Sequence, residues 1–139
     1  MTALLNVAVT TAVTAQTSSV LQLRSPRGVP TNAALQGTFT YGSGGTTADA
    51  WVQTSLDGGT TWCDVANFHF ALASARFVFN LSSLTVNTTQ VTPTDGTLAA
   101  NSAKDGIFGD FWRVKYTTVG TYAGNTQLRV DVVTAGLTQ

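Results

Sequence analysis

The 139-residue sequence predicts an all-β fold, a β-sandwich of about seven or eight antiparallel strands with jelly-roll or immunoglobulin-like topology. Threonine, a β-branched residue that favours strands, occurs 25 times. Strong helix formers are scarce, with no Glu, two Lys and one Met. Short segments of alternating apolar and polar residues recur between turns that contain Gly or Pro. A closed barrel would produce the same pattern and stays open as an alternative.

The first 16 residues are small and uncharged, and they differ from the rest of the chain. We interpret residues 1–16 as an N-terminal arm or edge strand, ahead of a single sandwich domain over residues 17–139. The apolar side chains of the arm have no evident place in a core that begins at residue 19, so we expect them to contact assembly partners. These candidate assembly contacts are Leu4, Leu5, Val7, Val9 and Val13. The alternative is that residues 4–9 complete the protein's own sheet.

Three strands are expected in the next part of the chain, over residues 19–24, 35–41 and 50–55. Two prolines and a glycine predict a turn over residues 25–30, and three glycines break the chain again over residues 42–45. In the second of these strands one face carries Leu35, Gly37, Phe39 and Tyr41. That face is expected to point into the core.

Later strands are expected over residues 77–81, 112–117 and 127–132. The last two alternate strictly and are interpreted as one hairpin, joined by a turn at residues 122–125. Inward positions in this pair are Trp112, Val114, Tyr116, Leu128, Val130 and Val132, and outward positions are Arg113, Lys115, Arg129 and Asp131. The polar region over residues 85–105 is a long excursion, of the kind that is usually functional or part of an interface.

The charge pattern narrows the classes of partner. Seven basic residues balance seven acidic ones, and only 10% of the residues are charged. Binding to nucleic acid through a basic surface is excluded, because the phosphate contacts need a clustered positive excess. A neutral, Thr-rich surface also repels its own copies weakly. This indicates either a surface that is covered by neighbours in an assembly or a surface that is merely rich in Thr.

No catalytic apparatus is visible, so we expect a protein that is not an enzyme. One cysteine, Cys63, and one histidine, His69, cannot form a disulfide or a zinc site. We therefore predict no catalytic residue, no metal site and no cofactor, and we interpret Cys63 as a small buried thiol. The N-terminus does not resemble a signal peptide, and no apolar run is long enough to cross a membrane.

The most specific local signal matches the Asp-box pattern, Ser/Thr-x-Asp-x-Gly-x-Thr-Trp. It predicts a tight hairpin between strands at residues 50–55 and 61–66, in which the aspartate accepts hydrogen bonds from the turn. The structural turn residues are Ser55, Asp57, Gly59, Thr61 and Trp62. Sialidases carry several copies, one in each propeller blade, whereas this chain has one copy and is too short for a propeller. The motif therefore indicates a hairpin and not glycan hydrolysis.

The run of residues 49–68, which contains this motif, resembles small proteins encoded by tailed bacteriophages. The resemblance continues through residues 93–98, 106–110 and 120–124 and covers about residues 35–135. Small β-sandwich proteins of this kind are similar to virion components, and many act as capsid decoration, or cement, proteins. The resemblance supplies no catalytic residues, and residues 1–30 do not share it.

These observations together predict a bacteriophage virion structural protein, a capsid decoration protein that binds and stabilises the head surface. The expected partners are the major capsid protein or other virion proteins, and the protein itself is expected to form a homo-oligomer, with a trimer as one option. It would be located in the virion after assembly in the host cytoplasm. The alternatives are a tail, neck or fibre-associated virion protein and a carbohydrate-binding module, for which Trp51 is the free aromatic candidate.

Overall fold

The computed structural model describes residues 1–23 and 29–138, and in them the chain forms eleven strands and no helix. All strand pairs are antiparallel, so the all-β prediction is confirmed. The strands are β1 Thr2–Ala8, β2 Val13–Thr17, β3 Leu21–Gln22, β4 Val29–Thr40, β5 Ser43–Gly44, β6 Thr47–Ser55, β7 Cys63–Phe70, β8 Ala75–Ser82, β9 Phe111–Val119, β10 Tyr122–Ala123 and β11 Gln127–Thr138.

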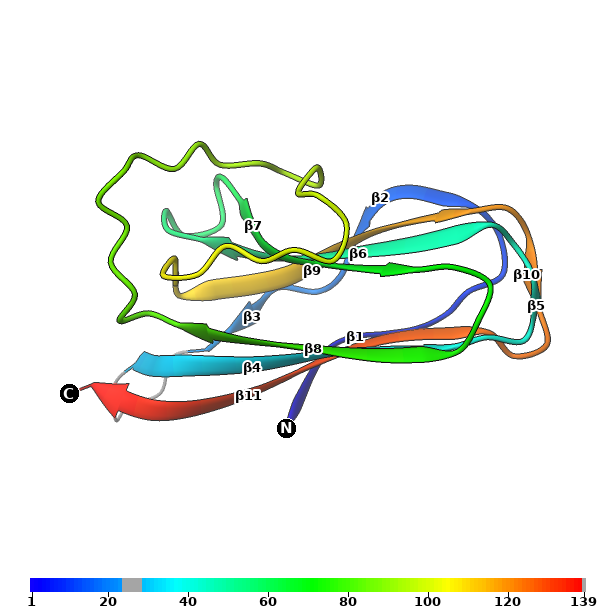
Figure 1. Ribbon diagram of the computed structural model, residues 1–139, viewed down its shortest axis with the longest axis horizontal. Helices are drawn as coiled ribbons and strands as arrows, with labels where there is room; N and C mark the ends of the chain where they lie inside the picture. The colour runs from blue at the N-terminus through cyan, green and yellow to red at the C-terminus, as the bar shows by residue number, and fades with distance from the viewer. Residues whose placement is uncertain (24–28, 139) are drawn as a thin grey trace.

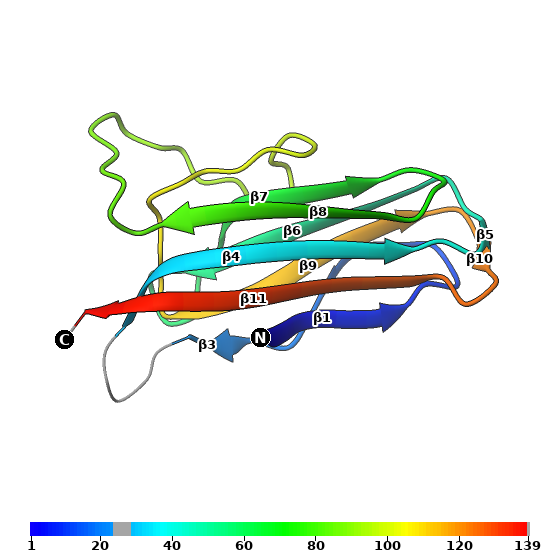
Figure 2. The same ribbon diagram turned by 60° about the horizontal axis from the view of Figure 1, so that its bottom comes forward.

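Two sheets pack face to face as a sandwich (Figure 1). The first sheet has the strand order β1-β11-β4-β8, which Figure 2 shows from its outer side. The second sheet has the order β2-β9-β6-β7, and the short β3 also pairs with β9. The small pair of β5 and β10 lies at one end, where the chain passes between the sheets.

The order of the strands is that of a jelly roll. Neighbours within each sheet come from distant parts of the sequence, and the chain crosses to the other sheet at almost every connection. Among the eight long strands of the described chain, β6 and β7 are consecutive strands that pair with each other. The predicted hairpin of the last two strands is therefore wrong: β9 belongs to the second sheet and β11 to the first. Alternation shows which face of a strand is buried, but it does not determine which strand lies beside it.

Another difference from the sequence prediction concerns the turn over residues 25–30. Val29 and Pro30 already belong to β4, where they pair with Thr138 and Leu137 of β11, and residues 24–28 lie outside the described part of the chain. The predicted excursion after β8 does lack strands, with one isolated bridge between Ala66 and Ala103.

The core lies between the two sheets and contains the inward positions that alternation predicted in β4, β9 and β11. Leu35, Phe39 and Trp112 are each about 1% exposed, and Val114 and Val130 are fully buried. The sheets approach closely at Gly37, because a Cβ atom there would lie 2.5 Å from Cγ of Phe68. A glycine at this position makes room for the aromatic ring of the facing strand.

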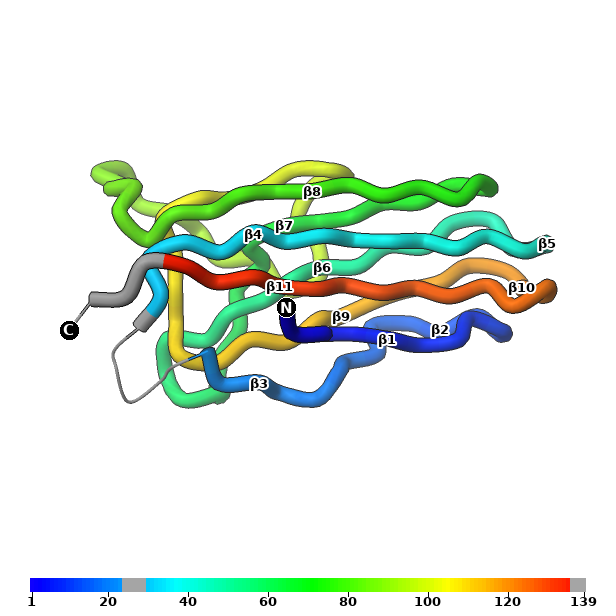
Figure 3. The backbone as a smooth tube through the Cα atoms, turned by 90° about the horizontal axis from the view of Figure 1, so that it is seen from below, coloured from blue at the N-terminus to red at the C-terminus, as the bar shows by residue number. Residues whose placement is uncertain are grey.

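The N-terminal segment forms an edge strand of the protein's own first sheet, where β1 pairs with β11 (Figure 3). A β-bulge between Ala3 and Leu5 turns both Leu4 and Leu5 inward, and both are at most 5% exposed. Val9 is also buried in the core. The expectation that these three side chains lack a place in the core is therefore wrong, because the core extends to the beginning of the chain.

Outward-facing Asp131 of β11 is not exposed as its position in the strand suggested. Its side chain is 6% exposed, and both carboxylate oxygens accept a hydrogen bond from Nε of Arg129 at 2.9 Å. Arg129 is thus the partner of a buried charge and not a plain surface residue.

We expect Arg129→Ser to lower the free energy of unfolding by about 1 kcal/mol, because Asp131 would remain buried without its ion pair. Urea unfolding of the purified variant measures this. Arg76→Ser is the matched control, since Arg76 is an exposed arginine on β8 of the same sheet, and it should cost less than about 0.5 kcal/mol. Equal costs for the two variants would contradict the role given to Arg129.

Candidate functional site

The hairpin between β6 and β7 carries the Asp-box residues, and hydrogen bonds of their side chains close its turn. The Ser55 hydroxyl donates to Asp57 at 2.9 Å and accepts from the Gly59 backbone N–H at 2.8 Å. Asp57 accepts from the Thr61 N–H at 2.8 Å and from the Thr61 hydroxyl at 2.6 Å. Gly58 and Gly59 have positive φ angles, and the Trp62 ring lies beside Gly59.

These hydrogen bonds affect the acidity of Asp57. The bond from the Thr61 hydroxyl is the largest cause that lowers its pKa from 3.8 to about 2, followed by the Thr61 backbone and the Ser55 hydroxyl. A carboxyl whose pKa is lower in the folded state stabilises the fold above its unfolded pKa, and that stability is lost as the pH falls through the folded pKa.

We therefore expect the melting temperature of the wild type to fall between about pH 4 and pH 2 more steeply than that of Asp57→Asn. The variant should melt at a lower temperature at pH 7, because the amide is a weaker acceptor for the turn. Thermal melts followed by circular dichroism over this pH range would measure both effects. If the melting temperatures of the two proteins fall in parallel over this pH range, the charge of Asp57 does not stabilise the turn.

The long loop over residues 83–110 covers the outer face of the second sheet beside this hairpin (Figure 1). Its backbone pairs with the free edge of β7 through bonds from the Asn67 N–H to the Ser102 carbonyl and from the Lys104 N–H to the Val65 carbonyl. Trp51 of β6 lies under it and donates its indole N–H to the Leu98 carbonyl at 3.0 Å. Trp51 is thus held by the loop.

Asp64, on β7, is the centre of the contacts between the loop and the sheet, and it is 1% exposed. Its carboxylate accepts hydrogen bonds from three successive backbone N–H groups, those of Gly96, Thr97 and Leu98, at 2.8–3.1 Å. It also accepts one from the Thr94 hydroxyl at 2.9 Å. A buried carboxylate with this many donors has no unsatisfied lone pair, which is the condition for keeping a charge in the interior.

Asp95 of the loop lies over two cationic side chains of β9. Lys115 Nζ lies 2.6 Å from its carboxylate and Arg113 3.8 Å, and the Gln53 amide donates to it at 2.6 Å. Burial alone would raise the pKa of Asp95, but the hydrogen bonds from Lys115 and Gln53 and the two positive charges outweigh it and hold the pKa below its usual value.

Arg113 and Lys115 do point to the outer face of the sheet, as alternation predicted, but the loop covers them. Their side chains are 16% and 15% exposed. Arg113 lies 4.2 Å above the Trp62 ring and donates to the Gln53 side chain at 2.8 Å. Gln53 also donates to Asp64 at 2.8 Å, so the two carboxylates and two cations form one network. We call the sheet part of this network, Trp51, Gln53, Asp64, Arg113 and Lys115, the Asp64 site.

Sequence reasoning missed the Asp64 site. The long excursion over residues 85–105 is predicted, but nothing in the sequence shows which strand this segment lies on. Gln53 gave no distinct signal, because it alternates with Val52 as an outward-facing polar residue of a strand does, and its complete burial depends on the partners described above.

Cys63 and His69 have separate surroundings. Cys63 is 8% exposed and lies 3.5 Å from the Thr54 carbonyl, and burial raises the pKa of its thiol. His69 lies 2.8 Å from Asp49. Over residues 1–23 and 29–138, no group of three or more Cys, His, Asp or Glu side chains could hold a metal ion, and no helix could cross a membrane.

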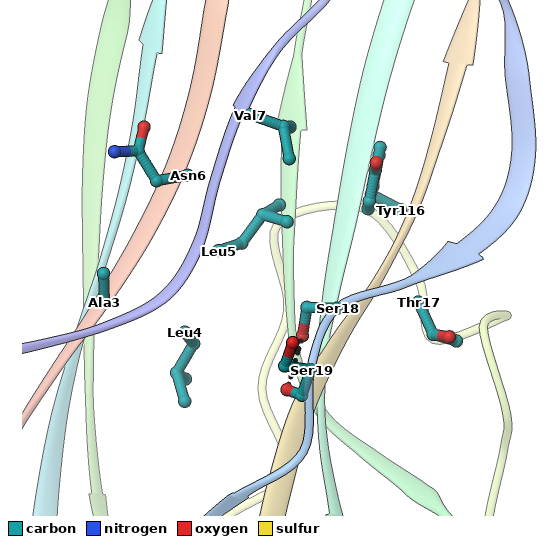
Figure 4. A pocket seen from close by; sticks show the side chains of 9 residues that line it. All are labelled: Ala3, Leu4, Leu5, Asn6, Val7, Thr17, Ser18, Ser19 and Tyr116. Atoms are coloured by element: carbon teal, nitrogen blue, oxygen red, sulfur yellow. Dashed lines mark hydrogen bonds between the residues drawn. The ribbon is translucent and has the colours of Figure 1, made fainter.

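A groove of about 420 Å³ lies at the edge of the sandwich, between β1 and the segment over residues 17–19. Figure 4 shows its lining, with Leu5 and Val7 on one side and Ser18, Ser19 and Tyr116 on the other. Of the five candidate assembly contacts, Val7 and Val13 are partly buried, and the other three belong to the core. The contribution of this edge to assembly stays a prediction.

No family model matches this sequence, and no curated protein matches it. A chain from the solved structure of sacbrood virus of honeybee, in expansion state II, has a similar fold. The TM-score is 0.50 at 9% sequence identity, and the match covers 100% of this chain and 97% of the other. This agreement over the whole of this chain and nearly all of the other supports the jelly-roll topology that the strand order indicates.

Proposed function

We propose that this protein is a structural component of a bacteriophage virion, a capsid decoration protein that binds and stabilises the head surface. The observation that carries the proposal is the jelly-roll fold, matched over its whole length by a chain of a virus particle. Viral capsid proteins are a large class with this fold. The phage origin and the decoration role in this proposal are supported by the resemblance of residues 35–135 to small phage proteins.

The surface chemistry supports an assembled protein. The chain has zero net charge and few charged residues, and several large apolar side chains are exposed. A neutral surface of this kind associates through apolar contact and shape more than through long-range charge. The proposed partners are the major capsid protein or other virion proteins, and further copies of this chain in a homo-oligomer.

Heads that lack the protein, mixed with the purified chain, test the proposal. We expect the chain to sediment with the heads and to raise the temperature at which they release their DNA. The bound fraction should change less than about twofold between 50 and 500 mM NaCl, because screening has little net charge to act on. A particle map would then show the protein on the head. Density on the tail or neck would instead support the rival virion role, and no binding to any particle part would overturn the proposal.

A further inference from the structure

The segment over residues 94–98 lies on the second sheet as a bound peptide lies on its receptor. The Thr94 hydroxyl and three successive N–H groups meet the Asp64 carboxylate, and the Asp64 N–H donates to the Thr94 carbonyl at 2.8 Å. Asp95 meets Lys115, and the Leu98 carbonyl accepts from Trp51. Backbone and side-chain groups of this short segment thus engage one site together.

None of the residues that form the Asp64 site belongs to the loop. Trp51, Gln53, Asp64, Arg113 and Lys115 are all on strands β6, β7 and β9. Bonds within the sheet connect Gln53 to Arg113 and to Asp64. Without Asp95 the site would carry two cations and one carboxylate, and the donors of Lys115 and Trp51 would lose their partners. The site therefore favours an occupant with one negative charge and free backbone N–H groups.

The site favours an occupant with a glycine after its aspartate. Gly96 has a φ of +85°, and a Cβ atom there would lie 2.8 Å from Cδ of Lys115. A larger residue would strain the backbone and require the Lys115 side chain to move away from its contact with Asp95. The site therefore accepts a segment such as Thr94-Asp95-Gly96-Thr97-Leu98. In it the aspartate pairs with Lys115, the glycine adopts the positive φ, and the threonine before them donates a hydrogen bond to Asp64.

The connection that precedes this segment is long and exposed. Residues 84–90 are all exposed, and the loop as a whole contains no strand. Because residues 101–104 are also hydrogen-bonded to β7, the element that leaves the sheet includes them as well as residues 94–98. The exposed connection before this element lengthens the loop at a small entropic cost. Exchange of an identical element between copies is a low-cost route to association, because every contact of the closed monomer is made again in the partner.

We propose that the Asp64 site is a binding site for an extended Thr-Asp-Gly-Thr-Leu segment, and that it accepts this segment from a second copy of the chain as well as from its own loop. Exchange would connect neighbouring copies without any new contact surface. The inference does not require the virion role, although neighbours held close together in a shell would favour exchange through their high effective concentration.

A variant with a vacant site tests the first half of the proposal. Residues 93–98 are replaced by a Gly/Ser segment of the same length, and a synthetic peptide of residues 91–101 is added while the fluorescence of Trp51 and Trp62 is followed. We expect saturable binding to the variant and much weaker binding to the wild type, in which the protein's own segment competes with the peptide for the site. Peptides with Asp95→Asn or Gly96→Ala should bind on the order of tenfold more weakly, or not at all.

Exchange between copies is tested with two complementary variants. The vacant-site variant offers a site without a segment, and Asp64→Ala offers a segment whose own site is damaged. Native mass spectrometry of the mixture should show a heterodimer that neither variant forms as a homodimer to the same extent. If the vacant-site variant does not fold, the full-length Gly96→Ala protein replaces it. Alanine is strained at this positive φ, so the substitution should loosen the segment while the sheet stays intact.

Peptide binding that ignores the Asp95 and Gly96 substitutions would overturn the assigned specificity. Failure of the peptide to bind a folded variant with a vacant site would overturn the site itself. If the peptide binds but no heterodimer forms, the site binds only the segment of its own chain, and the proposed exchange between copies is wrong. None of these outcomes depends on whether the protein binds phage heads, so the two proposals fail separately.

Discussion

Val130→Asp is expected to abolish folding. Val130 is fully buried between Leu5 of β1 and Gly37 of β4 in the middle of the first sheet. Aspartate there would lose the burial of the valine side chain and place a carboxylate among apolar groups, opposite the second sheet. The combined cost is comparable with the whole stability of a domain, about 5–15 kcal/mol. Circular dichroism and thermal melts should show no cooperative transition.

Val133→Asp is the matched control, since it makes the same substitution on the same strand. Val133 is on the opposite face of β11 and is 51% exposed. A carboxylate there stays in water, so the variant should fold and melt within a few degrees of the wild type. A folded Val130→Asp protein would show that the register of β11 is different from the one described.

Asp64→Ala is expected to lower the free energy of unfolding by about 3 kcal/mol and to release the loop. Three backbone N–H groups and the Gln53 amide would lose a charged acceptor in a place that water reaches poorly. Hydrogen exchange should accelerate at residues 94–98 and on the β7 edge, while the core strands stay protected. Urea unfolding gives the energy, and hydrogen exchange followed by mass spectrometry locates the opening.

Thr97→Ala is the control for this variant. It changes an exposed side chain of the same segment and leaves the N–H that Asp64 accepts. It should cost less than about 0.5 kcal/mol and leave the exchange pattern unchanged. Uniform acceleration of exchange throughout the Asp64→Ala protein would indicate that Asp64 supports the whole sandwich and not the loop alone.

Alternation of residue types predicted the core positions of β4, β9 and β11, although it missed those of the N-terminal segment. Leu35, Phe39, Trp112, Val114 and Val130 all point inward as expected, because period-two burial is a local property of a strand. The pairing of strands is not local. β9 and β11 looked like a hairpin because both alternate and a turn joins them, but the connection through β10 crosses from one sheet to the other.

The alternation of apolar and polar residues also did not predict which side chains on the outer faces of the two sheets are buried. Lys115 and Asp131 occupy outward positions, yet both are covered, the first by the loop and the second in an ion pair with Arg129. The sequence marks such residues only as polar. Lys115 is covered by the loop that precedes its own strand, and Asp131 pairs with Arg129 of its own strand, so loop packing and charge pairing, and not alternation alone, determine the exposure of the two side chains.

The β1–β11 pairing also has a consequence for the order in which the chain folds. Thr2 pairs with Val132, so β1 has no partner until almost the whole chain has been synthesised. The β6–β7 hairpin is local and can form early, but the first sheet must close very long loops, which makes folding slow. Until β11 arrives, Leu4 and Leu5 have no sheet to cover them. A newly made chain therefore exposes an apolar, strand-forming end, and this is the stage at which we expect it to be most prone to aggregation.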